Sequence, residues 1–255
     1  DGVMNYVFAD AVISFLTGKQ DAEALCLALT ALRQNYPKPF YDSCLTMLSS
    51  HDTVRLLTVL AGAPDRRSVS REVQAHFVPE ESRLNTAKKL MTLAQLIQLT
   101  HPGIPCIYYG DEAGVCGFTD PDNRRTYPWG KEDQEMLDFH KRMICIHKAY
   151  PILAKGSLEF LWNDHQGLSY GRFSDSEQII VILNNQDQER DIRVTAWKTG
   201  VSRKEATAFQ RLMLSSGEGY TEMPEEYIAD AGILQVKMPA YGAMVLHHRA
   251  RDKYK

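Results

Sequence analysis

The spacing of hydrophobic and polar positions changes near residue 153. Before that point, short apolar runs alternate with segments whose apolar residues recur every three or four positions, which is typical of strands alternating with helices. After Pro151, strand-like runs are separated by turn residues, with no helical pattern between them. We therefore predict an α/β region over residues 1–153 and an all-β region of antiparallel strands over residues 154–255.

The same pattern gives approximate bounds for the elements of each region. In the first region, it predicts strands over residues 2–6, 44–48 and 104–109, a polar loop over 65–77, and helices over 11–16, from 21 to before Pro37, over 84–97 and over 132–150. In the second region, it predicts strands over residues 157–162, 168–173, 179–183, 209–214, 234–238 and 244–248.

Composition narrows the classes of function. Hydrophobic residues make up 44% of the 255 residues and charged residues 24%, which is ordinary globular usage and excludes a disordered chain or a coiled coil. No apolar run approaches the roughly 18 residues that span a bilayer. Lysine and arginine number 29 against 32 acidic residues, a net charge of -3, so no overall field attracts nucleic acid or anionic lipid. We expect neither a nucleic-acid partner nor a membrane.

The cysteines and histidines indicate no metal or cofactor. Five scattered cysteines form no C-x-x-C pair, and no signal peptide is visible, so we expect a reducing, cytoplasmic setting. His140 and His147 could bind a metal with Cys145, but two helical turns separate the histidines, and buried packing is the better interpretation. The chain also lacks a starting methionine, and we expect it to begin inside a longer protein.

Polar clusters follow two of the predicted strands. His51 and Asp52 come after the strand at 44–48, a position where α/β barrels place active sites; alternatively, Asp52 caps the next helix and His51 packs beneath it. Asp111 and Glu112 follow the strand at 104–109. Adjacent residues of a strand point to opposite faces, so we favour a structural role, bonded to arginines and backbone, over a catalytic pair.

A third cluster occupies residues 120–129 and combines carboxylates, guanidinium groups and aromatic rings. Charged groups of this kind bind pairs of sugar hydroxyls, and aromatic rings stack on the apolar faces of sugars. The alternative is a network of surface ion pairs.

Together these segments resemble the C-terminal half of the α-amylase superfamily of glycoside hydrolases, in particular its neopullulanase and cyclomaltodextrinase group. Residues 3–6, 48–55 and 103–112 look like barrel strands six, seven and eight, the Asp-Pro-Asp-Asn-Arg-Arg run from Asp120 follows in the family's order, and residues 238–246 look like its final strands. The resemblance implies a partial (β/α)8 TIM barrel over residues 1–153 and a C-terminal antiparallel β-sandwich over residues 154–255.

The resemblance also implies roles for six residues. Asp52 would be the catalytic acid that stabilises the transition state by holding sugar hydroxyls, and His51 would bind the same sugar. Asp120 and Arg124 would bind the sugar further toward the non-reducing end. Arg125 and Trp129 are weaker candidates for substrate binding.

The two carboxylates that carry out the bond exchange are missing from this pattern. A retaining glycosidase needs a nucleophile and an acid roughly 5–5.5 Å apart. The family places them after strands four and five, and no Gly-Phe-Arg-x-Asp type motif occurs here. We therefore expect a fragment of a retaining α-glucan hydrolase or transglycosylase that needs the upstream remainder of its barrel and is inactive alone. The alternative is a non-catalytic glucan-binding or interaction module.

Overall fold

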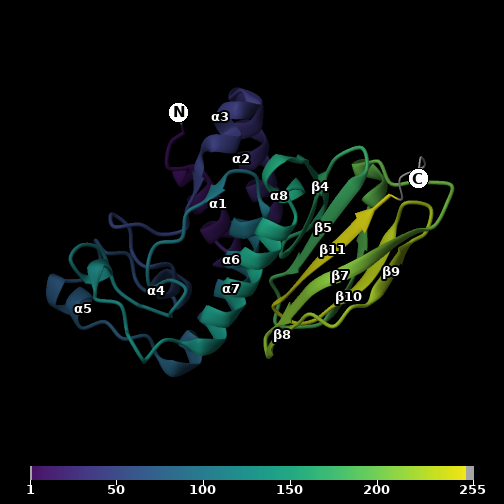
Figure 1. Ribbon diagram of the computed structural model, residues 1–255. Coiled ribbons are helices and arrows are strands. Elements are labelled where there is room, and N and C mark those ends of the chain that lie inside the picture. Colours follow the sequence, from purple (N-terminus) through teal and green to yellow (C-terminus); the bar gives the residue numbers. More distant parts are fainter. Residues whose placement is uncertain (1, 251–255) are drawn as a thin grey trace.

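The computed structural model describes residues 2–250, and Figure 1 shows helices gathered at one side and long strands at the other. The helices are α1 (Tyr6–Leu16), α2 (Ala22–Asn35), α3 (Lys38–Ser43), α4 (Leu56–Leu60), α5 (Arg71–Ala75), α6 (Glu81–Thr100), α7 (Gln134–Ala149) and α8 (Ile152–Lys155), with 3-10 turns η1 (Asp122–Arg124) and η2 (Ala196–Thr199). The strands are β1 (Leu45–Thr46), β2 (Ile104–Pro105), β3 (Ser157–Asn163), β4 (Gly167–Phe173), β5 (Glu177–Asn184), β6 (Arg190–Val194), β7 (Thr207–Ser216), β8 (Gly219–Thr221), β9 (Glu226–Ala229), β10 (Leu234–Met238) and β11 (Gly242–Arg249).

The three predicted strands of the first region pair in parallel, but they are much shorter than expected. β1 pairs with β2 over two residues, and the predicted strand at 2–6 is a single bridge between Met4 and Leu45. The Asn5 side chain accepts a hydrogen bond from the Phe8 amide at 3.0 Å and starts α1 at Tyr6, so the prediction that residues 2–6 form a strand was wrong.

The ladder between β1 and β2 uses the amides on either side of Pro105. The Ile104 amide donates to the Cys44 carbonyl at 2.9 Å, and the Cys106 amide donates to the Thr46 carbonyl at 3.1 Å. The buried Gln98 side chain on α6 also donates to the carbonyls of Thr46 at 2.8 Å and Cys106 at 3.0 Å. A helix side chain is thus bonded to the end of the short ladder.

The helices at 11–16, from 21, at 84–97 and at 132–150 are confirmed as α1, α2, α6 and α7. Four short helices were missed: α3, α4, α5 and α8. α3 follows Pro37 and carries Pro39 in its first turn, where proline is well tolerated, and α5 lies inside the predicted polar loop with Ser70 as its cap. α4 begins at Leu56, after the polar residues at 49–53.

The second region consists largely of antiparallel strands. β3-β4-β5-β11-β7-β8 are neighbours in one sheet, with β9 also paired to β7, and β6 and β10 form a separate pair. The six predicted strands are confirmed, whereas β6, β8 and β9 were missed. Their shortness and polar composition hid them from a search for apolar runs.

The large sheet is buried on both faces. Along β5, Ile179, Val181 and Leu183 belong to the hydrophobic core that includes the helices. Ile180 and Ile182 belong to a second core shared with β6 and β10. Full burial of each such side chain is worth about 1.5–3 kcal/mol. Alternate side chains of one strand thus pack against the helices on one face of the sheet and against the β6–β10 pair on the other.

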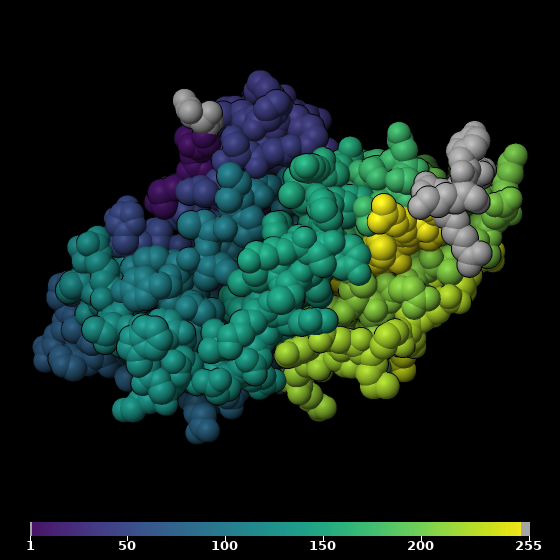
Figure 2. All heavy atoms as spheres, viewed as in Figure 1, coloured from purple at the N-terminus to yellow at the C-terminus, as the bar shows by residue number. Residues whose placement is uncertain are grey.

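Arg172 on β4 joins the two regions. Its guanidinium is fully buried and donates to the carbonyls of Thr100 at 2.8 Å, Gly156 at 2.9 Å, and Leu153. These acceptors belong to the end of α6 and to the chain around α8. The space-filling view shows the surface of α7 meeting the strands of the second region directly (Figure 2). No helix within residues 2–250 has the length and apolar character required to cross a membrane.

Candidate functional site

The site is built on the short loop that follows β1. The Ser50 amide donates to the Thr53 hydroxyl at 2.8 Å, and the Asp52 amide donates to the Ser50 hydroxyl at 3.1 Å. These bonds within the loop leave the side chains of His51 and Asp52 55% and 59% exposed. α4 begins only after Arg55 and has no side-chain cap, so the alternative in which Asp52 caps a helix is wrong.

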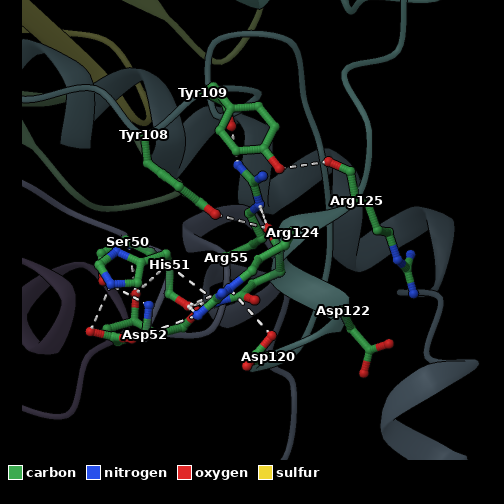
Figure 3. Close-up of polar contacts among 12 residues, drawn as sticks. Ser50, His51, Asp52, Arg55, Tyr108, Tyr109, Asp120, Asp122, Arg124 and Arg125 are labelled. Atoms are coloured by element: carbon green, nitrogen blue, oxygen red, sulfur yellow. Dashed lines mark hydrogen bonds and ion pairs between the residues drawn. The ribbon is translucent and has the colours of Figure 1, made fainter.

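Four polar side chains, three of them charged, lie together on this loop and on the loop at 120–124. The His51 Nε2 atom lies 3.2 Å from Asp52 Oδ2, and Arg124 Nε lies 3.2 Å from Asp120 Oδ1. Arg124 Nη2 also approaches Asp52 Oδ1 at 3.9 Å, so the guanidinium lies between the two carboxylates (Figure 3). Exposed ion pairs of this kind are weak, so the carboxylates remain available to a polar ligand. The structure therefore brings together four of the six predicted site residues.

A buried arginine supports this surface from beneath. Arg55 has no exposed surface, and its Nε atom donates to the main-chain carbonyl of Asn123 at 2.8 Å. Its Nη1 atom donates to the Tyr109 carbonyl and to Asp111 Oδ1, the latter at 3.3 Å. The guanidinium also stacks on the ring of Tyr108, 4.2 Å from the centroid. One side chain thus connects the loops that follow β1 and β2 with the turn η1.

Asp111 is part of this support and not of the exposed cluster. It is buried, and it accepts a hydrogen bond from the Ser49 hydroxyl as well as from Arg55. Burial raises the pKa of Asp111 to about 6, against the opposing effects of Ser49 and Arg55. The interpretation that Asp111 and Glu112 bond arginines and backbone near the strand ends is confirmed for Asp111 alone, because Glu112 Oε2 is buried without a hydrogen-bond partner among the described residues.

The comparison with protein families gives this arrangement its context. Residues 1–200 match the family described as the catalytic domain of alpha amylase. The chain belongs to the α-amylase family. Known members of the α-amylase family are similar along nearly the whole chain. The cyclomaltodextrinase of Geobacillus thermopakistaniensis is 32% identical over 95% of this chain, and an amylopullulanase of Thermoanaerobacter thermohydrosulfuricus is 32% identical over 91%.

A solved cyclomaltodextrinase structure from the α-amylase family superposes on 97% of this chain with a TM-score of 0.74 and 26% identity. The chain spans only part of these proteins: 35% of the curated cyclomaltodextrinase, 16% of the amylopullulanase and 37% of the solved cyclomaltodextrinase. These relatives are glycoside hydrolases.

The other two predicted site residues lie outside the cluster that His51, Asp52, Asp120 and Arg124 form. Arg125 turns its guanidinium away from Asp52 and donates to the Ala75 carbonyl at 3.0 Å (Figure 3). Trp129 is 81% exposed, and its ring centroid lies 4.6 Å from that of Tyr127. The pair presents an apolar surface, but the structure does not join it to the loop at 50–53.

The histidines considered as metal ligands have other partners. His140 is buried, its Nδ1 atom lies 3.2 Å from the Met136 carbonyl, and burial lowers its pKa to about 4. His147 Nδ1 lies 2.8 Å from the Leu99 carbonyl, and Cys145 is exposed. Within residues 2–250, no three side chains of the metal-binding types converge.

Sequence reasoning missed Arg55 and Asn123 as parts of the site. Both lie inside segments that it singled out, residues 48–55 and 120–125. Both residues could have been identified by their burial, but a single sequence does not show which polar side chains face inward.

Proposed function

We propose that His51, Asp52, Asp120 and Arg124 bind glucose units of an α-glucan, and that the protein is a retaining glycoside hydrolase or transglycosylase acting on maltooligosaccharides, cyclodextrins or pullulan. One observation carries the proposal: Arg124 lies between two exposed carboxylates that a buried polar layer holds in place. Carboxylates and guanidinium groups can each bond two adjacent hydroxyl groups of a sugar ring. The relatives named as a cyclomaltodextrinase and an amylopullulanase support the choice of a glucan.

In this proposal, Asp52 holds the hydroxyls of the sugar at the reacting bond, and His51 donates to the same ring. Such bonds speed the reaction when they strengthen as the sugar distorts toward an oxocarbenium-like transition state. Asp120 and Arg124 hold the preceding sugar. Arg125 and Trp129 form the outer part of the binding surface, the first through its main chain, whose carbonyl accepts from Tyr109 at 2.8 Å.

We further propose that residues 1–153 form strands six to eight of a (β/α)8 barrel, and that residues 154–255 form a C-terminal β-sandwich domain. The parallel Met4–β1–β2 pairing and the two-sided packing of β5 support this division. The nucleophile and the acid then come from other barrel strands, so this chain alone does not hydrolyse glucan. The five free thiols support a cytoplasmic setting.

Calorimetric titration with maltotriose tests the proposal. We expect saturable binding by the 255-residue chain and at least tenfold weaker binding by Asp52→Asn, because the neutral amide loses charge-assisted hydrogen bonds. Asp138→Asn is the matched control, since the Asp138 side chain is 58% exposed on α7 and, among residues 2–250, pairs only with Lys141. Absence of saturable binding, or equal binding by both variants and the parent chain, would overturn the assignment of the site. Release of glucose or maltose by the pure chain would contradict its proposed inactivity.

A further inference from the structure

The side chain of Asn123 forms hydrogen bonds with the main chain of the loop that carries Asp52. Asn123 is fully buried in η1, and its Nδ2 atom lies 2.8 Å from the His51 carbonyl, 2.8 Å from the Thr53 carbonyl and 3.3 Å from the Ser50 carbonyl. An amide nitrogen has two hydrogens, so three carbonyl oxygens share two donors. A single side chain thus contacts the main chain on both sides of Asp52.

The other bonds of the loop do not fix its position. Ser50, Asp52 and Thr53 bond one another, which sets the shape of the turn but not its place on the protein. Within the described residues, hydrogen bonds from residues 50–53 to other segments involve only Asn123 and Arg124. The two bonds from Arg124 to the His51 carbonyl are 3.3 Å long and come from an exposed side chain. Asn123 is therefore the buried anchor of the loop.

Asn123 is itself held from behind. Its carbonyl accepts from Arg55 Nε at 2.8 Å, and the preceding Asp122 pairs with Arg71 at 3.1 Å. The backbone at Gly117 passes so close to η1 that an added Cβ would lie 2.1 Å from the Asp122 carbonyl oxygen. The position of Asn123 is thus fixed by contacts with other segments of the chain, of which the one from Arg55 is fully buried.

We propose that Asn123 is a positioning residue: it sets the distance and angle between Asp52 and the Asp120–Arg124 pair, and so makes the four side chains one binding surface. The effect on ligands rests on the proposed function, whereas the effect on the loop does not. Arg124 follows Asn123 directly in η1, so the same short turn positions both Arg124 and the loop that carries Asp52. Misplacement of a binding group by about 1 Å can cost up to a hundredfold in activity.

Two variants and one control test this role. Asn123→Ala removes the amide, and Asn123→Asp keeps its volume while removing both donor hydrogens. Asn184→Ala is the control, because Asn184 is equally buried and donates to the carbonyls of Gln188 and Pro239 at 2.8 Å, in the second region. Thermal unfolding of each variant identifies a temperature at which all are folded.

The first readout is hydrogen exchange of the amides in residues 50–53, measured without ligand. We expect slow exchange in the parent chain in spite of the exposed side chains, and at least tenfold faster exchange in both Asn123 variants but not in Asn184→Ala. Fast exchange in the parent chain would already overturn the proposal, even if neither Asn123 variant folds. Unchanged exchange in folded Asn123 variants would overturn it as well.

The second readout is maltotriose binding at the same temperature. We expect about tenfold weaker binding by the Asn123 variants and unchanged binding by Asn184→Ala. Equal losses in all three variants would show a general effect of stability and overturn the positioning role. If the parent chain binds no glucan, the proposed function fails, and the exchange data still decide whether Asn123 holds the loop.

Discussion

Arg55 Nη1 lies 3.3 Å from Asp111 Oδ1, and both side chains are buried beneath the exposed cluster. The chain thus separates its charged groups into two layers. The lower layer is buried and hydrogen-bonded, and it includes Asn123. The upper layer of His51, Asp52 and Arg124 is open to solvent. A rigid support beneath exposed binding groups lowers the conformational entropy that the protein loses when a ligand binds.

Arg55→Met should destabilise the protein by about 3–5 kcal/mol, because it leaves the Asp111 carboxylate buried without its cation. Urea unfolding measures the loss. The double variant Arg55→Met/Asp111→Leu should recover part of it, since no buried charge remains unpaired. A loss below about 1 kcal/mol for the single variant would show that the buried pair does not hold the loops together.

His101 should make the protein less stable as the pH falls. Burial lowers the pKa of His101 to about 3, whereas the unfolded chain has the ordinary value near 6.5. Between these values the unfolded state binds more protons, so the stability from the neutral ring is fully present above pH 6.5 and is lost progressively toward pH 3.

The variant His101→Gln isolates this effect, because glutamine does not titrate. We measure the unfolding free energy of each protein in urea from pH 7 to pH 4. The value for the parent chain minus the value for the variant should decrease as the pH falls. Asp111 acts with the opposite sign: its raised pKa of about 6 makes the native state bind more protons between pH 3.8 and 6. This contribution is common to both proteins and cancels in the difference. A pH-independent difference would contradict the buried neutral state of His101.

Arg172→Met should destabilise the protein by about 2–5 kcal/mol, because the carbonyls of Thr100, Leu153 and Gly156 lose a buried donor. Scanning calorimetry measures the loss and also whether the two regions begin to unfold separately. Arg83→Met is the control, since Arg83 is exposed and pairs with Glu80 at 3.8 Å; it should change stability by less than about 1 kcal/mol. Similar results for both variants would contradict the joining role of Arg172.

Trp129→Ala should leave stability within about 0.5 kcal/mol, because the side chain is largely exposed. It should weaken maltotriose binding by roughly threefold to tenfold if the Trp129–Tyr127 pair stacks on a sugar ring. Calorimetric titration and quenching of tryptophan fluorescence measure this effect. Unchanged affinity would remove Trp129 from the binding surface.

The long elements could be predicted from the sequence, because their apolar period is determined locally. α7 carries a regular apolar stripe, the last two turns of α6 are apolar enough to be buried on all sides, and half of the residues of β5 are β-branched. The extents of β1 and β2 could not be predicted, because they depend on partners distant in sequence. Gln98, on a helix, bonds the carbonyls of Thr46 and Cys106 where the short ladder ends.

The exposed half of the candidate site could also be proposed from sequence. His51, Asp52, Asp120 and Arg124 are polar residues of types that bind hydroxyls, and they occur in segments that resemble a known family. The buried half could not, because the three carbonyls around the Asn123 amide meet only in the folded chain. Arg125 has a residue type and a position in the sequence that suit sugar binding, but its guanidinium donates to the Ala75 carbonyl instead.

Mapping of bound maltotriose by NMR on the isotope-labelled chain tests the central claim most directly. The account predicts saturable shifts of the backbone amides of His51, Asp52, Asp120 and Arg124, with these shifts needing at least tenfold more sugar in Asp52→Asn. One competing surface is the cavity of about 380 Å³ between α6, α7 and the β7–β8 hairpin, which Tyr220 lines. Shifts confined to that cavity, or no saturable shifts at all, would contradict the assignment of the loop at 50–53 as the glucan-binding site.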